Sequence, residues 1–258
     1  MTRSPSPYIL VTNDDGVTSP GLHALSEAMR ALGDVSVVAP EVERSAVGHA
    51  ITRHSPLQVK EFRQNGRMAG YAVNGTPADC VKLAVSTLLE RRPDLVVSGI
   101  NLGPNTATNI IYSGTVSAAT EARILGIQSM AISVGTFQDP IWETSAIFAQ
   151  RFARLVLEQG LPPKVLLNVN VPNLALGEVK GVRVTRQGDS RYEDRFESHG
   201  DSRSTTPTYQ SAASYRMSDV DEATDALALA QGFVSVTPIS YDLTSFAMLD
   251  ELSRWELS

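Results

Sequence analysis

Two adjacent carboxylates follow the first apolar segment of the chain. Asp14 and Asp15 lie in the run Asn13-Asp-Asp-Gly16, directly after the β-branched segment 8–12. Neighbouring carboxylates repel each other, and a hard divalent cation such as Mg²⁺, Mn²⁺ or Ca²⁺ would neutralise them because it prefers oxygen ligands. Asp-Gly is also a common turn dipeptide, so this run taken alone favours an ordinary turn.

Polar side chains also follow two later apolar segments. Arg44-Ser45 comes soon after segment 35–38, and residues 98–105 follow Val96-Val97. A hydroxyl and an amide oxygen are neutral ligands for a hard cation, and the glycines in 98–105 allow backbone to approach a ligand closely. An all-oxygen metal site could therefore be formed by Asp14, Asp15, Ser45 and Asn101.

A candidate anion site precedes a predicted helix over 115–125. The run Tyr112-Ser-Gly-Thr115 offers hydroxyls and backbone amides at the helix N-terminus, where the helix dipole favours negative charge. In isolation an ordinary Ser or Thr N-cap explains it equally well. A metal site and a phosphate-sized anion site at one edge of a sheet are harder to explain by chance. The combination points to phosphoryl chemistry.

These residues can meet only if the elements form a parallel sheet. Strands are predicted over 8–12, 35–38, 94–100 and 128–134, alternating with helices over 19–33, 76–88 and 115–125. Such βαβ alternation predicts a parallel sheet covered on both faces, which binds ligands at the carboxyl ends of its strands. The fold class is therefore predicted to be α/β, with a mostly parallel sheet flanked by helices.

The second half of the chain is less regular. Helices are predicted over 142–158 and 221–230, and strands over 164–171, 181–186 and 233–239. Residues 188–217 lack clear periodicity, which favours an arm, a lid or an oligomer contact, with a flexible surface loop as an equally supported alternative. We expect a catalytic core over 1–180 and a C-terminal extension over 181–258 that carries an oligomerisation arm. Methionines and aromatic residues are expected in the core.

Composition excludes several classes of protein. The 22 Lys+Arg against 28 Asp+Glu give a net charge of −6, which argues against duplex nucleic acid as a partner. One cysteine, Cys80, cannot form an internal disulfide, and no apolar run approaches the roughly 18 residues that span a bilayer. We therefore expect a cytoplasmic protein with no membrane partner. P-loop, dinucleotide-binding, nucleophile-elbow and His-Glu-x-x-His motifs are absent from the sequence.

The order and spacing of these motifs resemble those of the SurE family. The similarity extends over about residues 8–250. It is carried by Ile9-Leu-Val-Thr-Asn-Asp-Asp-Gly16, Arg44-Ser45, Gly75-Thr-Pro-Ala-Asp-Cys80, Ser98-Gly-Ile-Asn101, Gly103-Pro-Asn105, Tyr112-Ser-Gly-Thr-Val116 and Leu167-Asn-Val-Asn-Val-Pro172. Two features depart from the family pattern: Ala46 stands where a glycine usually follows Arg-Ser, and residues 189–217 show no match.

The resemblance implies a Rossmann-like core and a metal-dependent phosphatase acting on nucleoside monophosphates. It implies one divalent cation per subunit, Mg²⁺ or Mn²⁺ first and Ca²⁺ as a third candidate, and a homodimer or homotetramer. The implied metal ligands are Asp14, Asp15, Ser45 and Asn101. The implied phosphate-binding residues are Asn105, Ser113, Gly114 and Thr115.

The expected activity is hydrolysis of nucleoside 5′-monophosphates, with 3′-nucleotides and short polyphosphate as further candidate substrates. Asp14 or Asp15 would orient the attacking water or move its proton. Direct attack by a carboxylate is the chemical alternative. A non-catalytic nucleotide sensor and a sugar-nucleotide transferase are the alternative functions on the same sheet.

Overall fold

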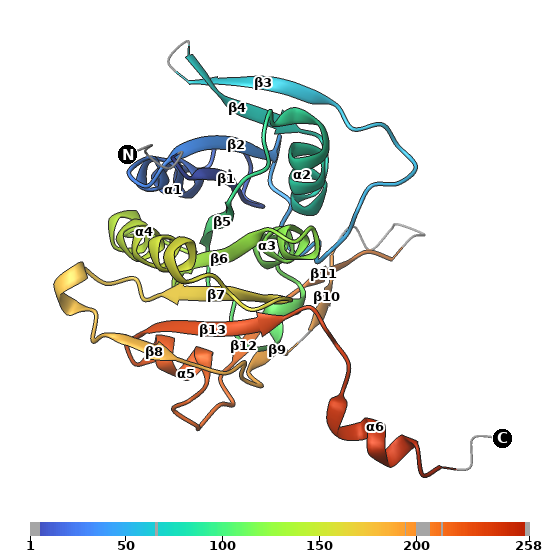
Figure 1. Ribbon diagram of the computed structural model, residues 1–258. Coiled ribbons are helices and arrows are strands. Elements are labelled where there is room, and N and C mark those ends of the chain that lie inside the picture. The colour runs from blue at the N-terminus through green and yellow to red at the C-terminus, as the bar shows by residue number, and fades with distance from the viewer. Residues whose placement is uncertain (1–5, 65–66, 194, 200–206, 213, 256–258) are drawn as a thin grey trace.

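The core of the protein is a nine-stranded sheet with the strand order β3-β4-β2-β1-β5-β6-β7-β13-β8 (Figure 1). The computed structural model describes residues 6–64, 67–193, 195–199, 207–212 and 214–255. The strands of this sheet are β1 (Tyr8–Thr12), β2 (Asp34–Pro40), β3 (Val59–Gln64), β4 (Arg67–Val73), β5 (Leu95–Leu102), β6 (Gln128–Val134), β7 (Val165–Val171), β8 (Val182–Val184) and β13 (Val234–Ser240).

Most neighbouring strands run parallel, and the direction of winding changes at β1. From β1 the chain proceeds outward to β2 and β4 on one side, then returns to place β5, β6 and β7 on the other, all in parallel pairing. Only the pairs β3–β4 and β7–β13 are antiparallel among the described strands of this sheet. The gap between the carboxyl ends of β1 and β5 is therefore the switch point at which an open α/β sheet binds its ligands.

Helices cover both faces of the sheet. Helices α1 (Pro20–Arg30) and α4 (Trp142–Gln159) pack on one face, and α2 (Pro77–Leu83) and α3 (Gly114–Ile124) pack on the other. Leu25 and Phe148 belong to the first of the two main cores, and Cys80 and Ala118 belong to the second. This layering confirms the predicted mostly parallel α/β fold.

The helix starts follow from capping residues in the sequence. Ser19 caps α1 and accepts from Leu22 N, with Pro20 as the first helical residue. Thr76 and Asp79 form a reciprocal capping box at the start of α2. The helix predicted over 76–88 is regular only to Leu83 and continues as a π-helical turn over Ala84–Leu88. The first helix ends at Arg30, three residues before the predicted stop at 33.

The C-terminal part both extends the sheet and projects from it. Strands β13 and β8 join the core sheet beyond the predicted boundary at residue 180, and the division of the chain there stays a prediction. Residues 188–217, called the arm below, contain two antiparallel pairs, β9 (Arg191–Glu193) with β12 (Ser214–Arg216) and β10 (Phe196–Ser198) with β11 (Tyr209–Ser211). Residues 194, 200–206 and 213 of this segment lie outside the described residues.

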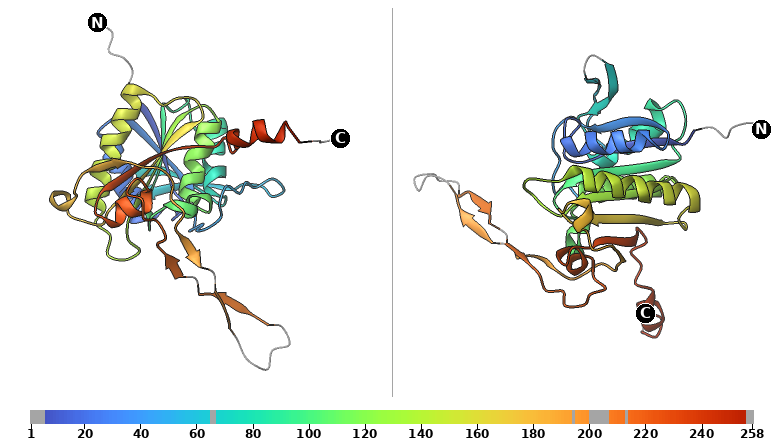
Figure 2. Two further views of the ribbon diagram at one scale, coloured as in Figure 1. Left: turned by 90° about the horizontal axis from the view of Figure 1, so that it is seen from below. Right: turned by 90° about the vertical axis from the view of Figure 1, so that its left-hand side faces the viewer.

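Two elements of the C-terminal part point away from the body. The arm extends as a long ribbon, and α6 (Phe246–Leu252) projects in a different direction (Figure 2). The remaining elements are the short helices η2 (Ala107–Ile111), η3 (Leu176–Glu178) and α5 (Asp225–Ala230). Within the described residues, every helix is too short or too polar to cross a bilayer.

Candidate active site at the carboxyl ends of β1 and β5

A cavity of about 700 Å³ opens at the switch point. Its wall brings together polar side chains from four segments that are distant in sequence. Asp14 follows β1, Ser45 follows β2, Asn101 and Asn105 come from the end of β5 and the loop after it, and Ser113 precedes α3. Five of the eight residues singled out in the sequence therefore line one cavity. The other three, Asp15, Gly114 and Thr115, lie next to residues of that wall.

Asp14 is held by the first turn of α3. Its carboxylate accepts a hydrogen bond from the Thr115 hydroxyl, and burial raises its pKa, while hydrogen bonds from Thr115 and from the backbone of Gly114 partly offset the increase. A Cβ on Gly114 would lie 2.8 Å from both Cβ and Oδ2 of Asp14. The glycine therefore allows the helix start to approach the carboxylate. Gly114 and Thr115, which the resemblance assigned to phosphate, contact the carboxylate in this structure.

Asp15 lies against the end of β5. Its Oδ2 accepts a hydrogen bond of 3.2 Å from the backbone N–H of Leu102. Burial, followed by the neighbouring charge of Asp14 and the charge of Glu43, raises the pKa of Asp15 to about 7. The two carboxylates thus sit in surroundings that disfavour two negative charges, which is the electrostatic situation that a bound cation relieves.

Asn101 is oriented by its own loop. Strand β5 changes register against β6 between Ser98 and Asn101 and pairs again from Asn101, so the site begins at an irregularity of the strand. The Asn101 Nδ2 donates to the carbonyl of Gly103 at 2.7 Å, and its Oδ1 lies 3.2 Å from the Thr115 hydroxyl. The amide oxygen is therefore turned toward the group that also contacts Asp14.

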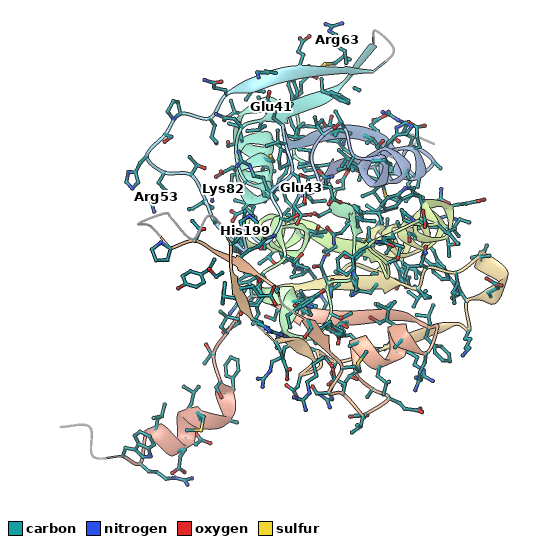
Figure 3. All side chains as sticks on the ribbon, turned by 180° about the vertical axis from the view of Figure 1, so that it is seen from behind. Glu41, Glu43, Arg53, Arg63, Lys82 and His199 are labelled. Carbon is teal, nitrogen blue, oxygen red and sulfur yellow. The ribbon has the colours of Figure 1, made fainter. Side chains whose placement is uncertain are left out.

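Ser45 comes from the segment 41–58 between β2 and β3, called the Ser45 loop below. Its hydroxyl donates to Glu43 at 2.5 Å, and the backbone N–H of Arg44 donates to the Asp14 carbonyl at 2.7 Å. Glu41 and Glu43 follow β2 directly, and Arg53 lies farther along the loop (Figure 3). Ser45 shares the cavity wall with Asp14 and Asn101, but in this structure its hydrogen bond is to Glu43.

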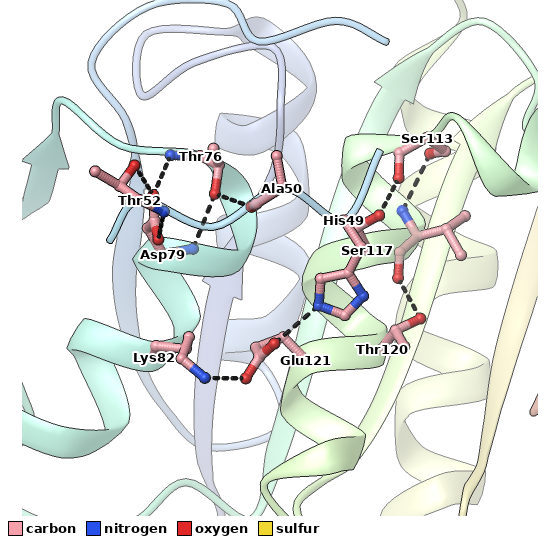
Figure 4. A network of polar contacts seen from close by, with 11 residues as sticks. His49, Ala50, Thr52, Thr76, Asp79, Lys82, Ser113, Ser117, Thr120 and Glu121 are labelled. Atoms are coloured by element: carbon pink, nitrogen blue, oxygen red, sulfur yellow. Dashed lines mark hydrogen bonds and ion pairs between the residues drawn. The ribbon is translucent and has the colours of Figure 1, made fainter. Parts of the chain in front are cut away.

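Partly buried polar contacts join the Ser45 loop to α2 and α3 (Figure 4). His49 Nε2 lies 2.8 Å from Glu121 Oε2, and Lys82 Nζ lies 2.8 Å from Glu121 Oε1. Asp79 accepts from both the backbone N–H and the hydroxyl of Thr52, at 2.9 and 2.7 Å. Burial would raise the pKa of Glu121, but the hydrogen bonds from His49 and Lys82 outweigh it and lower that pKa.

We expect Glu121→Gln to destabilise the protein and loosen the Ser45 loop. The Glu121 side chain is 4% exposed, and a hydrogen bond to a charged group contributes about 1.5–3 kcal/mol to stability. Chemical denaturation measures the loss. The matched control is Glu27→Gln, which removes the charge from the exposed pair with Arg30 and should cost less than about 1 kcal/mol. Equal effects of the two substitutions would contradict the role given to Glu121.

Asn105 is fixed by two amides that project from β7. Its backbone N–H donates to Asn170 Oδ1 at 2.8 Å, and its carbonyl accepts from Asn168 and Asn170 at 2.8 and 3.1 Å. Its side-chain Nδ2 donates to Ser133 at 2.9 Å, and since an amide group has two N–H donors, the second can serve a ligand. Asn168 and Asn170 lie in the run Leu167–Pro172 that carries the resemblance, but the sequence pattern assigns them no role at the site.

Ser113 begins α3 as its N-cap. Its hydroxyl oxygen accepts from the backbone N–H of Val116 at 3.1 Å, and its carbonyl accepts from Ser117. The Ser113 O–H itself remains able to donate toward the cavity that it lines. The serine is therefore an ordinary N-cap that also lies in the cavity wall, and its role in binding an anion stays a prediction.

The donor set fits a hard divalent cation. Within the described part of the chain, no group of three or more His, Cys, Asp or Glu side chains is arranged to hold a metal, so an ion here would use two carboxylates with neutral oxygens. Buried side-chain oxygens of Thr12, Asn13 and Ser98 also have no hydrogen-bond partner among the residues that the structure describes. The end of the sheet therefore carries more buried oxygen than the protein itself satisfies.

The raised pKa of Asp15 has a consequence for the metal-free protein. Because the folded protein binds this proton more tightly than an unfolded chain with the ordinary value of 3.8, the contribution of Asp15 to stability is greatest below about pH 4 and is lost as the pH rises to about 7. We expect Asp15→Asn to flatten this part of the profile. Denaturation of both chelator-treated proteins between pH 4 and 8 measures how the stability of each depends on pH. The same pH dependence in wild type and variant would contradict the raised pKa of Asp15.

Aromatic side chains form another part of the cavity wall. Tyr112, Phe137 and Tyr192 line the cavity and are exposed by 62%, 60% and 36%. The expectation that aromatic residues belong to the core is therefore wrong for these three. Arg191, which precedes Tyr192 on β9, also lines the cavity, so the arm contributes to the site. Sequence pattern could not indicate this, since nothing in it relates residues 191–192 to the end of β1.

Comparison with known proteins gives one family. The family described as survival protein SurE matches residues 9–194. The 5′-nucleotidase SurE of Syntrophobacter fumaroxidans is 51% identical over 249 residues, which cover 96% of this chain and 99% of that protein. The protein of the same name from Geobacter metallireducens is 48% identical, with 97% and 98% covered. The crystal structure of a SurE protein from Aquifex aeolicus superposes with a TM-score of 0.84 at 43% identity, covering 96% of this chain and 98% of that one.

Proposed function

The chain belongs to the SurE family, and from this premise we propose that it is a 5′-nucleotidase that hydrolyses nucleoside 5′-monophosphates with one divalent cation. The observation that carries the proposal is the meeting of Asp14, Asn101 and Thr115 at the switch point of the sheet. Relatives named 5′-nucleotidase along nearly the whole chain support the substrate class.

We assign the cation to Asp14, Asp15, Ser45 and Asn101. The Ser45 hydroxyl would have to exchange its hydrogen bond to Glu43 for the cation. A bound Mg²⁺ or Mn²⁺ supplies Lewis-acid neutralisation of the phosphoryl charge and lowers the pKa of bound water. Four protein oxygens leave positions for water or substrate, as a catalytic site requires.

The two carboxylates are assigned different further tasks. Asp14 lines the cavity, so it is the carboxylate that can accept a hydrogen bond from an attacking water and orient it toward phosphorus. Asp15 is not part of the cavity wall, and its carboxylate accepts a hydrogen bond from the Leu102 amide. This position suits binding the cation rather than transferring a proton. Thr115 fixes the Asp14 carboxylate through its hydroxyl.

The phosphoryl group would be bound by other donors of the same cavity wall. The second N–H of the Asn105 amide and the Ser113 hydroxyl supply hydrogen bonds, and the N-terminus of α3 supplies the favourable end of a helix dipole. Such preorganised donors stabilise the charge that develops on the phosphoryl oxygens during transfer.

Release of inorganic phosphate from a panel of substrates tests the proposal. The panel contains nucleoside 5′-monophosphates, nucleoside 3′-monophosphates and short polyphosphate, each with Mg²⁺ or Mn²⁺. We expect the 5′-monophosphates to be hydrolysed. Protein that binds nucleotides but releases no phosphate would be a sensor instead, and the proposal would be wrong.

We also propose that the chain forms a homodimer or homotetramer through the arm and α6. Helix α6 contains no buried residue, although it carries Phe246 and Leu249 and is preceded by Leu243, which is 93% exposed. An apolar helix that projects from the body is best explained by a second copy that covers it. A monomer in light scattering at working concentration would contradict this.

A further inference from the structure

The cavity is polar on one side and aromatic on another. Asp14, Ser45 and Asn101 belong only to this cavity, whereas Phe137 and Tyr192 also line a second cavity of about 450 Å³ beside it. The two rings therefore stand at the boundary between the cavities, away from the carboxylates. Both rings also share the first cavity with Asn105 and Ser113, the candidate phosphate donors.

Phe137 is held in place by a glycine. A Cβ on Gly103 would lie 2.1 Å from the ring edge of Phe137, so the ring packs directly on the Gly103 backbone, which has φ +106°. The carbonyl of Gly103 accepts the hydrogen bond that orients Asn101. The loop that presents a candidate metal ligand therefore also supports an exposed aromatic ring.

Tyr192 is held by contacts within the arm. Its ring lies edge-to-face with that of Tyr215 on the partner strand β12, at a centroid distance of 5.3 Å. Such pairs prefer this arrangement, which fixes the orientation of Tyr192 and leaves it more than a third exposed. Burial raises the pKa of Tyr192, so the ring is neutral at physiological pH.

The base of the arm is anchored to the loop that flanks the cavity. The carbonyl of Ser190 accepts from the backbone N–H and the hydroxyl of Thr108, at 3.3 and 3.1 Å. Buried Asp225 accepts from the backbone of Ala107 and Gly188 at 2.9 and 3.0 Å, which joins η2, the arm and α5. Tyr192, two residues beyond Ser190, is therefore placed against the cavity by buried polar contacts.

We propose that Phe137 and Tyr192 form the subsite for the nucleobase of the substrate, with the flat heteroaromatic ring stacked on their exposed faces. The inference rests on the proposed function and adds to it the residues that distinguish a nucleotide from other phosphate monoesters. Stacking on an aromatic side chain depends little on which base is present, so this subsite selects for a base without selecting strongly among bases. The arm supplies one of its two rings.

The test compares a substrate with a base to one without. Phosphate release from a nucleoside 5′-monophosphate and from ribose 5-phosphate is measured for wild type, Phe137→Leu and Tyr192→Leu. We expect kcat/KM for the nucleotide to fall roughly 5- to 140-fold, chiefly through KM, as loss of stacking to one ring predicts. Activity on ribose 5-phosphate should stay within about twofold. Tyr192→Phe should behave as wild type because it keeps the aromatic face.

Two controls keep the test decisive. Phe196→Leu changes an exposed aromatic of the arm that lines neither cavity and should leave both substrates unaffected. Calorimetric titration with the nucleoside alone gives a readout that needs no turnover, and its affinity should fall in the two Leu variants. Equal losses on both substrates, or unchanged nucleotide KM and nucleoside affinity, would overturn the subsite. Failure of the wild type to release phosphate from either ester would instead overturn the proposed function, and the titration would still test the subsite.

Discussion

Replacing Asp15 with Asn should abolish metal-dependent phosphate release while leaving the protein folded. The substitution keeps the shape of the side chain and removes one of two adjacent charges that the surroundings disfavour, so the metal-free variant should be at least as stable as wild type at pH 8. Loss of a residue that only hydrogen-bonds to a metal ligand lowers activity roughly 10- to 100-fold. Because Asp15 is assigned as a ligand itself, its loss should lower activity by more than this.

The measurement is kcat/KM for a nucleoside 5′-monophosphate with saturating Mn²⁺, together with Mn²⁺ affinity. Asp34→Asn serves as the control, since Asp34 lies at the amino end of β2, away from the carboxyl ends that form the site, and its side chain is 69% exposed. Wild-type activity and Mn²⁺ affinity in Asp15→Asn would remove Asp15 from the site. Equal losses in the control would show that the effect is not local.

Gly114→Ala should also cause a large loss of activity, although helix propensity favours the opposite effect on stability. Alanine is a better helix former than glycine by about 1 kcal/mol in a helix interior, and Gly114, as the first residue of α3, gains only part of this. The added methyl group would lie 2.8 Å from the Asp14 carboxylate and 3.1 Å from Pro77, so the carboxylate has to move. We expect a 10- to 100-fold lower kcat/KM, in line with displaced ligands at metal sites.

Gly177→Ala is the matched control, because a Cβ at that position has no atom within 4 Å. Activity and Mn²⁺ affinity are measured for both variants, with unfolding midpoints to separate local displacement from loss of fold. Gly114→Ala with unchanged activity and affinity would mean that the contact between α3 and Asp14 does not set the position of the carboxylate.

The polar residues of the site could be predicted from the sequence because they lie at or just after the ends of predicted strands. Asp14 follows β1 and Asn101 lies at the end of β5, and parallel pairing of these two strands brings their carboxyl ends together. The Tyr112–Thr115 run was found by its position before a helix, and capping chemistry explains that position. The assignments of metal and phosphate to these residues stay predictions.

Local pattern could not predict the contacts that tune this site. Glu121 lies in the middle of α3, where a charged residue is expected at the surface. It is instead buried and paired with His49 and Lys82, which are 72 and 39 residues away in the sequence. Such a pairing depends on how α2, α3 and the Ser45 loop pack, which spacing along one element does not encode. The sequence pattern also predicts neither β3 nor β4, since β3 is the edge strand with no buried position among its described residues, and β4 beside it is buried only toward its end.

The sequence pattern predicts no strands in the arm, for a related reason. Its strands are exposed on both faces, so no core imposes an alternation of apolar and polar residues. They are held by local antiparallel pairing and by anchoring at Ser190 and Asp225. The lack of a periodic pattern in the arm also means that the sequence does not predict a role for Tyr192. Its place in the cavity depends on the direction in which the arm leaves the body.

The most direct test of the central claim is phosphate release from a nucleoside 5′-monophosphate after removal and return of the metal. The wild-type protein is treated with EDTA, desalted and assayed before and after addition of Mg²⁺ or Mn²⁺. We expect activity to disappear on chelation and to return with either ion. Full activity in the chelated protein would contradict a site built on Asp14, Asp15, Ser45 and Asn101 as metal ligands.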